Sequence, residues 1–384
     1  MKDNKKNNSF EIFVVFLCLL IVYVFPVSSN LSLSSNLHGD IYYYMRLIVL
    51  PLAIISIFRQ HNRTKIEIFE YFLMLLLSIL SYVVYGEIPW TSILLFSCFI
   101  LFDSLSKTKV DFYKNRKIFV IISVFLIFQI VVMFFLNRTH IGVMGSYKDA
   151  NYTGYFLIII YYIIGNSNKN TIFQYRDIFL ILSFLTFSRT AMICVMLIYF
   201  LRFSRFSFNK IIKKPGLVFY FAFFLWMLVC DFYVSYFEKT KYVYLFNTGI
   251  SRLSNFIDYS NYIRSFINIK LFKNFTLNSL LFGFTENAYK ALIFFEGKNA
   301  NPHNMFFAIY QQCGIIFSIF LVRRFTSIFL KGKGLMDMYI VFLIYAMILG
   351  PSIYYGIDLI LVYIASMMYK KNNYLLEVSD DKKT

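Results

Sequence analysis

The chain has 384 residues, of which 59% are hydrophobic and only 15% charged, and this composition excludes an ordinary water-soluble protein. Aromatic residues make up 21% of the chain, more than a soluble core of this size needs. The net charge of +18 is spread over the connections between apolar runs, so nucleic acid is not an expected partner. The cysteines all fall in apolar runs without metal-ligand spacing and are expected to be small buried hydrophobic residues: Cys18, Cys98, Cys194, Cys230 and Cys313.

Apolar runs that could form membrane-spanning helices follow one another along the chain. They lie near residues 10–27, 41–58, 66–85, 88–105, 117–136, 151–165, 216–236, 303–322, 335–350 and 353–369. A membrane-spanning helix needs roughly 20 apolar residues. The first run lacks a small-residue cleavage pattern after it and is interpreted as a retained span. The sequence therefore predicts an all-α integral membrane protein.

The basic connections predict which side of the membrane each segment faces. Connections such as "RQHNRTK", "SKTKVDFYKNRK" and "RRFTSIFLKGKG" are rich in Lys and Arg and are placed in the cytoplasm together with the N-terminus. The stretch 177–203 lies between two such connections, so it has to leave the cytoplasm and return. We interpret it as a hairpin of two short helices with Arg189 at its outer turn. The resulting topology has about twelve membrane spans, with both termini in the cytoplasm.

The predicted topology divides the chain into three parts. Residues 1–236 form an N-terminal transmembrane bundle that includes the short hairpin around 178–203, residues 237–302 a large extracytoplasmic loop, and residues 303–384 the C-terminal helices and a cytoplasmic tail. The loop carries eight basic and four acidic residues. Either an anionic ligand or the tolerance of long loops for basic residues explains this excess. The loop segments "YIRSFINIKLF" and "NSLLFGF" predict partial helices that lie on the membrane.

Two residues at predicted outer helix ends are the first candidates for chemistry. His303 follows Pro302 at the start of a span, where helix N-termini favour anions and an imidazole can act as general base. A packed interfacial histidine is the alternative. Arg189 in "LTFSRTAM" is the second candidate. Burying an arginine within the membrane costs free energy, so Arg189 is expected to face a cavity and a partner. The alternative is that its side chain extends to the outer lipid head groups.

Other candidates lie in the large loop and at the start of the span at 151–165. Arg252 and Arg264 can grip phosphate oxygens with two parallel hydrogen bonds, although a solvated surface role is the alternative for each. Asn151 and Tyr152 in "GVMGSYKDANYTGYF" stand at the outer start of a span, where Asn can bind sugar hydroxyls or simply cap the helix.

The order of these motifs resembles the bacterial O-antigen polymerase and ligase superfamily, and most closely the Wzy-type polysaccharide polymerases, which include capsule polymerases. The resemblance rests on "GSYKDANYTGYF", "LTFSRTAM", "SRL", "YSNYIRSF", "LLFGFTEN" and "NPHNMFFAIYQQCGIIFSIFL" and covers about residues 140–322. Two features depart from the family pattern. The turn after the loop arginine reads "GFT", with the single Gly283, and Arg252 and Arg264 compete for one arginine position.

The resemblance implies a GT-C-like membrane glycosyltransferase of the bacterial plasma membrane. Its expected activity is the polymerisation of undecaprenyl diphosphate-linked oligosaccharide repeats into O-antigen or capsular polysaccharide at the outer face, without a metal or other cofactor. Carried over by position, the catalytic residues are His303, Arg264 and Arg189. The residues expected to bind substrate beside them are Arg252, Asn304, Asn151 and Tyr152. Whether a chain-length regulator protein is a further partner stays open.

Two alternatives remain. One is a ligase that moves finished glycan to lipid A core or to a protein, which would use the same arginines and histidine. The other is a polysaccharide flippase or secondary transporter. Transporters usually place polar sites near the midplane between related halves, whereas here the charged candidates gather at the predicted outer face and the halves show no similarity.

Overall fold

The computed structural model describes residues 48–59, 64–86, 90–107, 150–164, 175–204, 211–240, 259–296, 304–331 and 335–348, together with scattered residues between and beyond these ranges. These residues are almost entirely helical, in agreement with the all-α prediction. In chain order the elements are α4 (Val49–Arg59), α5 (Lys65–Tyr85), α6 (Trp90–Lys107), α8 (Ala150–Ile164), α9 (Asp177–Phe184), α10 (Arg189–Ser204), α11 (Pro215–Thr240), α13 (Tyr259–Lys273), α14 (Leu277–Phe282), α15 (Glu286–Ile293), β1 (Phe294–Phe295), β2 (Lys298–Asn299), α16 (Met305–Ser327), the 3-10 helix η5 (Ile328–Lys331) and α17 (Leu335–Ile348).

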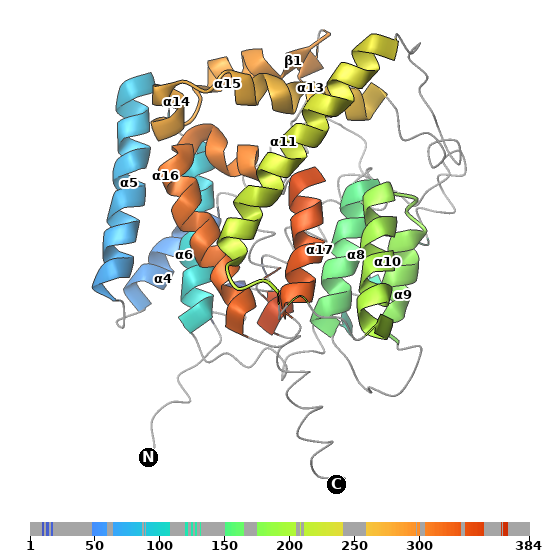
Figure 1. Ribbon diagram of the computed structural model, residues 1–384. Coiled ribbons are helices and arrows are strands. Elements are labelled where there is room, and N and C mark those ends of the chain that lie inside the picture. Colours follow the sequence, from blue (N-terminus) through green and yellow to red (C-terminus); the bar gives the residue numbers. More distant parts are fainter. Residues whose placement is uncertain are drawn as a thin grey trace, which may run out of the picture.

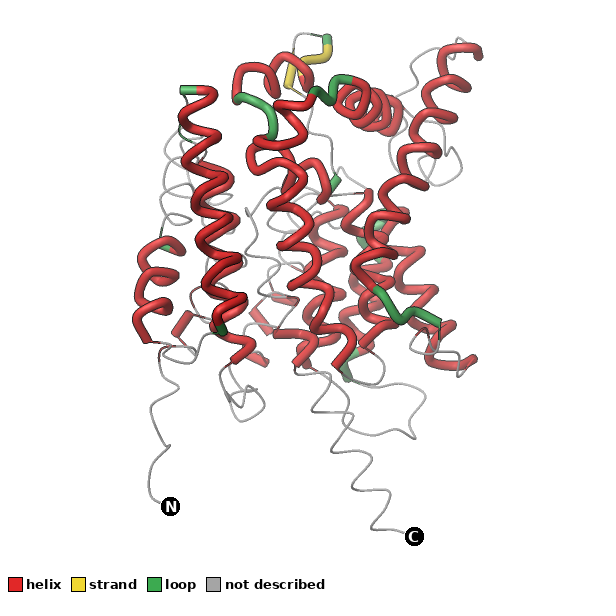
Figure 2. Tube along the Cα trace, turned by 60° about the vertical axis from the view of Figure 1, so that its left-hand side comes forward, coloured by secondary structure: helices red, strands yellow, loops and turns green. Residues whose placement is uncertain are grey.

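The long helices stand side by side as a bundle, and the elements from α13 to β1 lie across one end of it (Figure 1, Figure 2). We call the end at which α5 finishes, at Tyr85, the upper end, and the end at which it begins, at Lys65, the lower end. The only strands among the described residues are β1 and β2, which pair antiparallel with Phe294 opposite Asn299. The sequence pattern did not predict this short strand pair.

Two described helices, α5 and α11, are long and apolar enough to cross a membrane. The sequence sets the limits of α5 clearly. Thr64 and Glu67 form a capping box, in which each side chain accepts a hydrogen bond from the other residue's backbone N–H. Gly86 ends the helix in the left-handed conformation that glycine adopts at no steric cost. Shorter apolar helices occupy 49–59, 96–105, 153–164 and 335–348.

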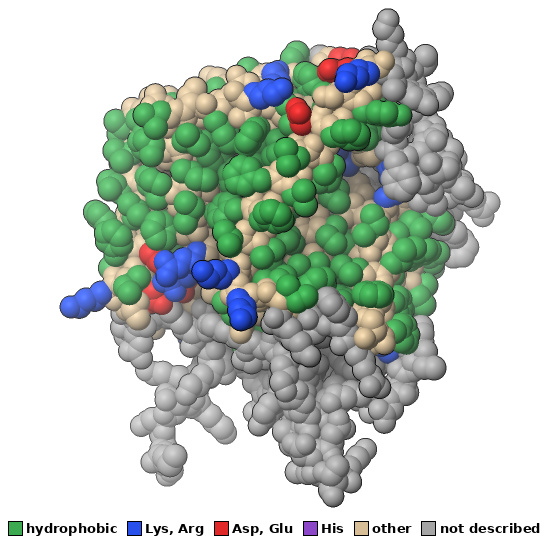
Figure 3. Space-filling model, in the orientation of Figure 1, with side chains coloured by type: hydrophobic (Ala, Val, Ile, Leu, Met, Phe, Trp, Pro, Cys, Tyr) green, Lys and Arg blue, Asp and Glu red, His purple; other side chains and the backbone are tan. Residues whose placement is uncertain are grey.

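Large apolar side chains cover the outside of the bundle on α5 and α11. Phe72 is 62% exposed, Phe221 67%, Leu228 69% and Phe232 73%. Figure 3 shows that hydrophobic side chains dominate this face, while charged side chains gather near its upper and lower margins. Apolar surfaces of this extent mark contact with lipid or with other protein. The apolar face therefore fits a membrane location, although the twelve predicted spans reach beyond the described residues.

The stretch 177–203 contains two helices, α9 and α10, as the hairpin interpretation predicts, and Arg189 is the first residue of α10. Gly154 lets α8 pack closely against this hairpin. A Cβ atom at Gly154 would lie 2.7 Å from the Cβ of Ala191, and Ser183 Oγ donates to the Gly154 carbonyl at 3.1 Å. The hairpin is thus fixed to the bundle along α8.

Helices α13 and α14 form at the two loop segments in which partial helices were predicted. Helix α13 packs on α11, where the rings of Tyr262 and Phe237 stack with centroids 4.3 Å apart. At the other side of this layer, Tyr85 Oη donates to the Gly283 carbonyl at 2.8 Å and ties α14 to the end of α5. The segment 237–302 therefore packs onto the bundle through its described part. Whether it lies on a membrane stays a prediction.

The three cysteines that the structure describes with their side chains are buried and have free thiols: Cys98, Cys194 and Cys230. This agrees with their interpretation as small hydrophobic residues.

Helix α16 is interrupted at Gly314, where φ is 70° and ψ is −176°. Only glycine adopts this backbone conformation readily. The break lets α14 come very close, because a Cβ atom at this position would lie 2.1 Å from the Leu281 carbonyl oxygen. The nine residues from Met305 to Cys313 thus form a short half-helix before the long descending part of α16.

We expect Gly314→Ala to destabilise the protein, since it adds both a backbone strain of about 1–3 kcal/mol and a steric clash with α14. The measurement is the temperature at which the detergent-purified protein loses its monodisperse elution. Gly216→Ala is the matched control, because its Cβ would meet nothing closer than Thr326 Oγ1 at 3.4 Å. Equal melting of both variants would contradict the packing at the break.

A buried ion cluster joins α5 and α16 at the lower end. Arg324 Nε donates to Glu70 Oε2 at 2.8 Å, and Arg324 Nη1 lies 3.5 Å from Glu67 Oε1. Both carboxylates are buried, with 3% of Glu70 and 7% of Glu67 exposed. Two further links lie at this end, from Arg202 to Asp177 and from Tyr71 to Asp103.

Arg324→Gln should lower the free energy of unfolding by about 3–5 kcal/mol, because it leaves two buried carboxylates without their cation. Adding Glu70→Gln to this variant should restore part of the loss. The neighbouring exposed Arg323 provides the control variant Arg323→Gln. Thermal unfolding of the four proteins in one detergent tests this, and a harmless Arg324→Gln would speak against the ion cluster.

Candidate functional site

The half-helix of α16 is preceded by its N-cap residue Asn304, which is completely buried. Its side-chain Oδ1 accepts from the Phe306 backbone N–H at 2.9 Å and so caps the helix. Its Nδ2 donates to the Met347 carbonyl at 3.1 Å, near the end of α17. Because both ends of the amide are engaged, the structure gives Asn304 a positioning role between α16 and α17. Its predicted contact with substrate stays a prediction.

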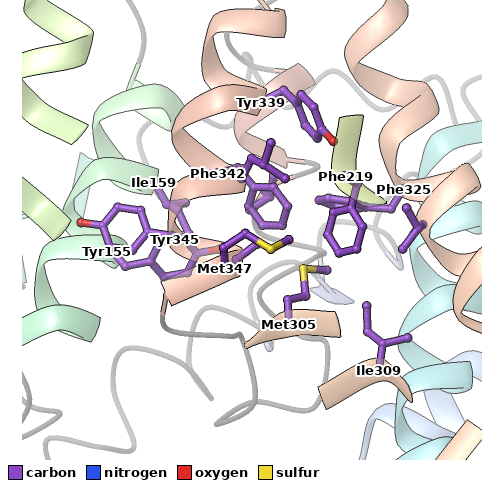
Figure 4. Packing of buried hydrophobic residues seen from close by; sticks show 14 of the residues in the cluster. Tyr155, Ile159, Phe219, Met305, Ile309, Phe325, Tyr339, Phe342, Tyr345 and Met347 are labelled. Atoms are coloured by element: carbon purple, nitrogen blue, oxygen red, sulfur yellow. The ribbon is translucent and has the colours of Figure 1, made fainter. Parts of the chain in front are cut away.

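An aromatic contact joins α17, and through it the start of α16, to α8. Tyr345, two residues before Met347 on α17, packs against Tyr155 with ring centroids 4.8 Å apart. Figure 4 shows Met305, Met347, Tyr345 and Tyr155 following one another across the buried interior. Tyr155 lies one helical turn below Asn151, which stands in the first turn of α8.

The first turns of α8 and α10 meet through one hydrogen bond. Ser188 Oγ donates to Asn151 Oδ1 at 2.7 Å and also accepts from the Ala191 backbone N–H at 3.3 Å, so Ser188 is the N-cap of α10. Arg189 follows directly as the first residue of this helix. Asn151, Ser188 and Asn304 are therefore linked through the end of α17.

This arrangement favours negative charge. The N-termini of α8 and α10 meet, and the N-terminus of α16 is linked to them through the end of α17. Each of these N-termini carries partial positive charge from its backbone N–H groups. The first turn of each of these helices lacks an acidic residue, and Arg189 adds a half-buried cation to one of them. A cation at a helix N-terminus opposes the helix dipole and weakens the helix. Such a local cost is typical of a functional position.

Arg264 lies half-buried on α13, one turn before the buried Asn268. Asn268 Nδ2 contacts Cys230 Sγ on α11 at 3.8 Å and anchors this part of α13. Figure 3 shows basic side chains in a recess between the layer of α13 and the upper ends of the α8–α10 group. The described elements bordering this recess carry Arg189 in the first turn of α10 and Arg264 in the first half of α13.

The remaining predicted residues can be placed only in part. Asn151 and Tyr152 both belong to the first turn of α8, but only the side chain of Asn151 is described. His303 and Arg252 lie outside the described residues. The structure thus joins Asn151 to Ser188, next to Arg189, and links them to Asn304 only through the end of α17. It places Arg264 on α13, in the layer at the upper end.

Three residues of this site were not predicted from the sequence: Ser188, Tyr155 and Tyr345. A serine directly before a helix start is the usual N-cap, so the segment "SRTAM" held a usable signal for Ser188. The two tyrosines had no such signal, since the aromatic content of the chain is high throughout. Among the described residues, no group of three or more His, Cys, Asp or Glu side chains is arranged to hold a metal ion.

Comparisons of the chain with protein-family models, with curated proteins and with solved structures found no match.

Ser188→Ala should lower stability by about 0.5–2 kcal/mol, because it removes the cap of α10 and the hydrogen bond to Asn151. Ser78→Ala is the matched control, since Ser78 Oγ donates only to the Met74 carbonyl of its own helix, at 3.0 Å. The two unfolding temperatures in detergent are compared. A Ser188 variant as stable as the Ser78 variant would argue against the contact between α8 and α10.

Proposed function

We propose that this chain is an integral membrane glycosyltransferase that polymerises polyprenyl diphosphate-linked oligosaccharide repeats at the outer face of the bacterial plasma membrane. The observation that carries the proposal is the hydrogen bond between Ser188 and Asn151, which joins the first turns of α8 and α10 next to Arg189. The start of α16 is linked to them through the end of α17. These helix starts contain described parts of three of the motifs whose order resembles the Wzy-type polymerases. An electropositive, half-buried place of this kind suits a diphosphate.

The topology proposed here has about twelve spans, with the lower end in the cytoplasm. Basic residues accompany the lower ends of several helices: Lys65 at the start of α5, Lys213 and Lys214 before α11, Arg202 near the end of α10, and Arg323 and Arg324 near the end of α16. An excess of Lys and Arg is typical of cytoplasmic loops and helix ends. The upper end, with Arg189 and the layer of α13, then faces outward.

In the proposed reaction, a sugar hydroxyl of the acceptor attacks the anomeric carbon of the donor glycan, and polyprenyl diphosphate leaves. His303, which adjoins Asn304 in the chain, would take the proton of that hydroxyl. Arg189 and Arg264 would stabilise the charge that develops on the leaving diphosphate, with Arg252 assisting. Stabilisation of developing charge by prearranged donors is often the largest single contribution to catalysis.

The break in α16 does not favour a transporter. Discontinuous helices in transporters usually form a binding site near the membrane midplane. Here Gly314 packs against Leu281 of α14, which is tied to the last residue of α5 at the upper end. The break therefore belongs to the upper end of the bundle and not to its middle.

Arg264→Gln should shorten the polysaccharide strongly, because loss of one charge-stabilising donor typically lowers the rate about 10²–10³-fold. His303→Ala should act similarly. The test expresses each variant in a strain that lacks the wild-type gene and measures the chain-length ladder on gels, with the amount of protein in the membrane measured alongside. Lys273→Gln is the matched control on α13, since the Lys273 side chain is 70% exposed and lies 3.9 Å from an exposed Asp231.

Normal ladders from both Arg264→Gln and His303→Ala would overturn the proposed active site. The deletion strain separates the polymerase from the ligase. Accumulation of single repeats on the carrier lipid supports a polymerase, whereas accumulation of long lipid-linked chains shows a ligase.

A further inference from the structure

An apolar groove lies between α9 and α10, directly below the turn that leads to Arg189. Its volume is about 390 Å³, within the range of about 300–1,000 Å³ that is usual for small-molecule sites. Apolar and aromatic side chains line it, among them Ile181, Phe184, Leu185, Val195, Met196 and Tyr199.

The groove opens to the outside of the bundle. Ile181 is 43% exposed, Leu185 41% and Met196 57%. The hairpin packs on α8 and α17 on its other side and stands at the margin of the bundle (Figure 1). In the proposed topology this open side faces the lipid.

The groove is aligned with Arg189. Met196 lies seven residues after Arg189, which is two helical turns, so both project from the same face of α10 about 10 Å apart along the axis. At the upper end, Leu185 caps α9 and begins the short connection to α10. Tyr199 lies about 15 Å below Arg189, a length close to half of the hydrocarbon core of a bilayer.

An ion pair marks the opposite end of the hairpin. Arg202 Nη1 donates to both carboxylate oxygens of Asp177, at 3.1 and 3.0 Å, and so ties the start of α9 to the last turns of α10. The groove thus has a cation above it and a closed hairpin below it. This order matches a molecule that has an anionic head followed by a hydrocarbon chain, whose first part would lie in the groove.

We propose that this groove binds the isoprenoid chain of the lipid carrier while Arg189 holds its diphosphate. This assignment rests on the proposed function and adds to it the path of the lipid. Continuity between the groove and the arginine selects an anionic lipid, and the proposed reaction makes that lipid a polyprenyl diphosphate.

Filling the groove should weaken binding of the carrier lipid. Met196→Trp places a large ring in the groove, whereas Leu225→Trp changes an exposed residue of α11 that does not line it, with 52% of the residue exposed. Undecaprenyl diphosphate without any glycan is titrated into the full-length purified protein, and binding is measured by native mass spectrometry. We expect about tenfold weaker binding to Met196→Trp and unchanged binding to Leu225→Trp.

Two further ligands test the roles of the head and the chain. Geranyl diphosphate has the same head with a chain too short to fill the groove, so it should bind the wild type and both variants equally weakly. An excess of phosphatidic acid should leave bound undecaprenyl diphosphate in place. Both variants are first checked for normal elution and helix content, and Ile181→Trp replaces Met196→Trp if the latter fails to fold.

Equal binding of undecaprenyl diphosphate by the groove variant and its control would overturn the proposal. Displacement by phosphatidic acid would also overturn it, since the groove would then accept any anionic lipid. Because polymer formation is not measured here, this failure is distinct from failure of the proposed function. Intact lipid binding by a protein that makes no polymer would count against the proposed function alone.

Discussion

The hydrogen bonds of Asn304 are the constraint on which the upper part of the structure depends. A completely buried amide has to satisfy both its donor and its acceptor, and Asn304 does so with the start of its own helix and with the Met347 carbonyl of α17. This fixes where the half-helix of α16 begins. From the same end of α17, the contact of Tyr345 with Tyr155 and the hydrogen bond of Ser188 with Asn151 extend the arrangement to α8 and α10.

The arginines at the two ends of the bundle lie in different surroundings. At the lower end, Arg324 and Arg202 are matched by buried carboxylates, which is the arrangement expected of a structural element. At the upper end, Arg189 stands at a helix N-terminus whose first turn carries no acidic residue. Because a cation at a helix N-terminus opposes the helix dipole, Arg189 weakens its own helix, and this local cost agrees with the proposed role of Arg189 in diphosphate binding.

Much of the local structure could be predicted from the sequence. The apolar runs of α5 and α11, the hairpin around Arg189 and the helices α13 and α14 all follow from hydropathy, charge and turn residues. The break at Gly314 could not be predicted, because it depends on the close approach of α14, which is distant in the sequence. The contact between Tyr155 and Tyr345 could not be predicted either, because it also joins two helices that are distant in the sequence. The resemblance predicted Asn304 as a substrate-binding residue, and the structure adds a positioning role, which depends on contacts with the distant Met347.

The central claim is that the upper end transfers glycan between lipid-linked repeats without an energy source other than the substrate. It is tested most directly by purified protein in liposomes that contain only the lipid-linked repeat and no ion gradient. Our account predicts glycan chains of several repeats together with release of polyprenyl diphosphate. Movement of unchanged lipid-linked repeats across the bilayer, with no new glycosidic bond, would contradict it.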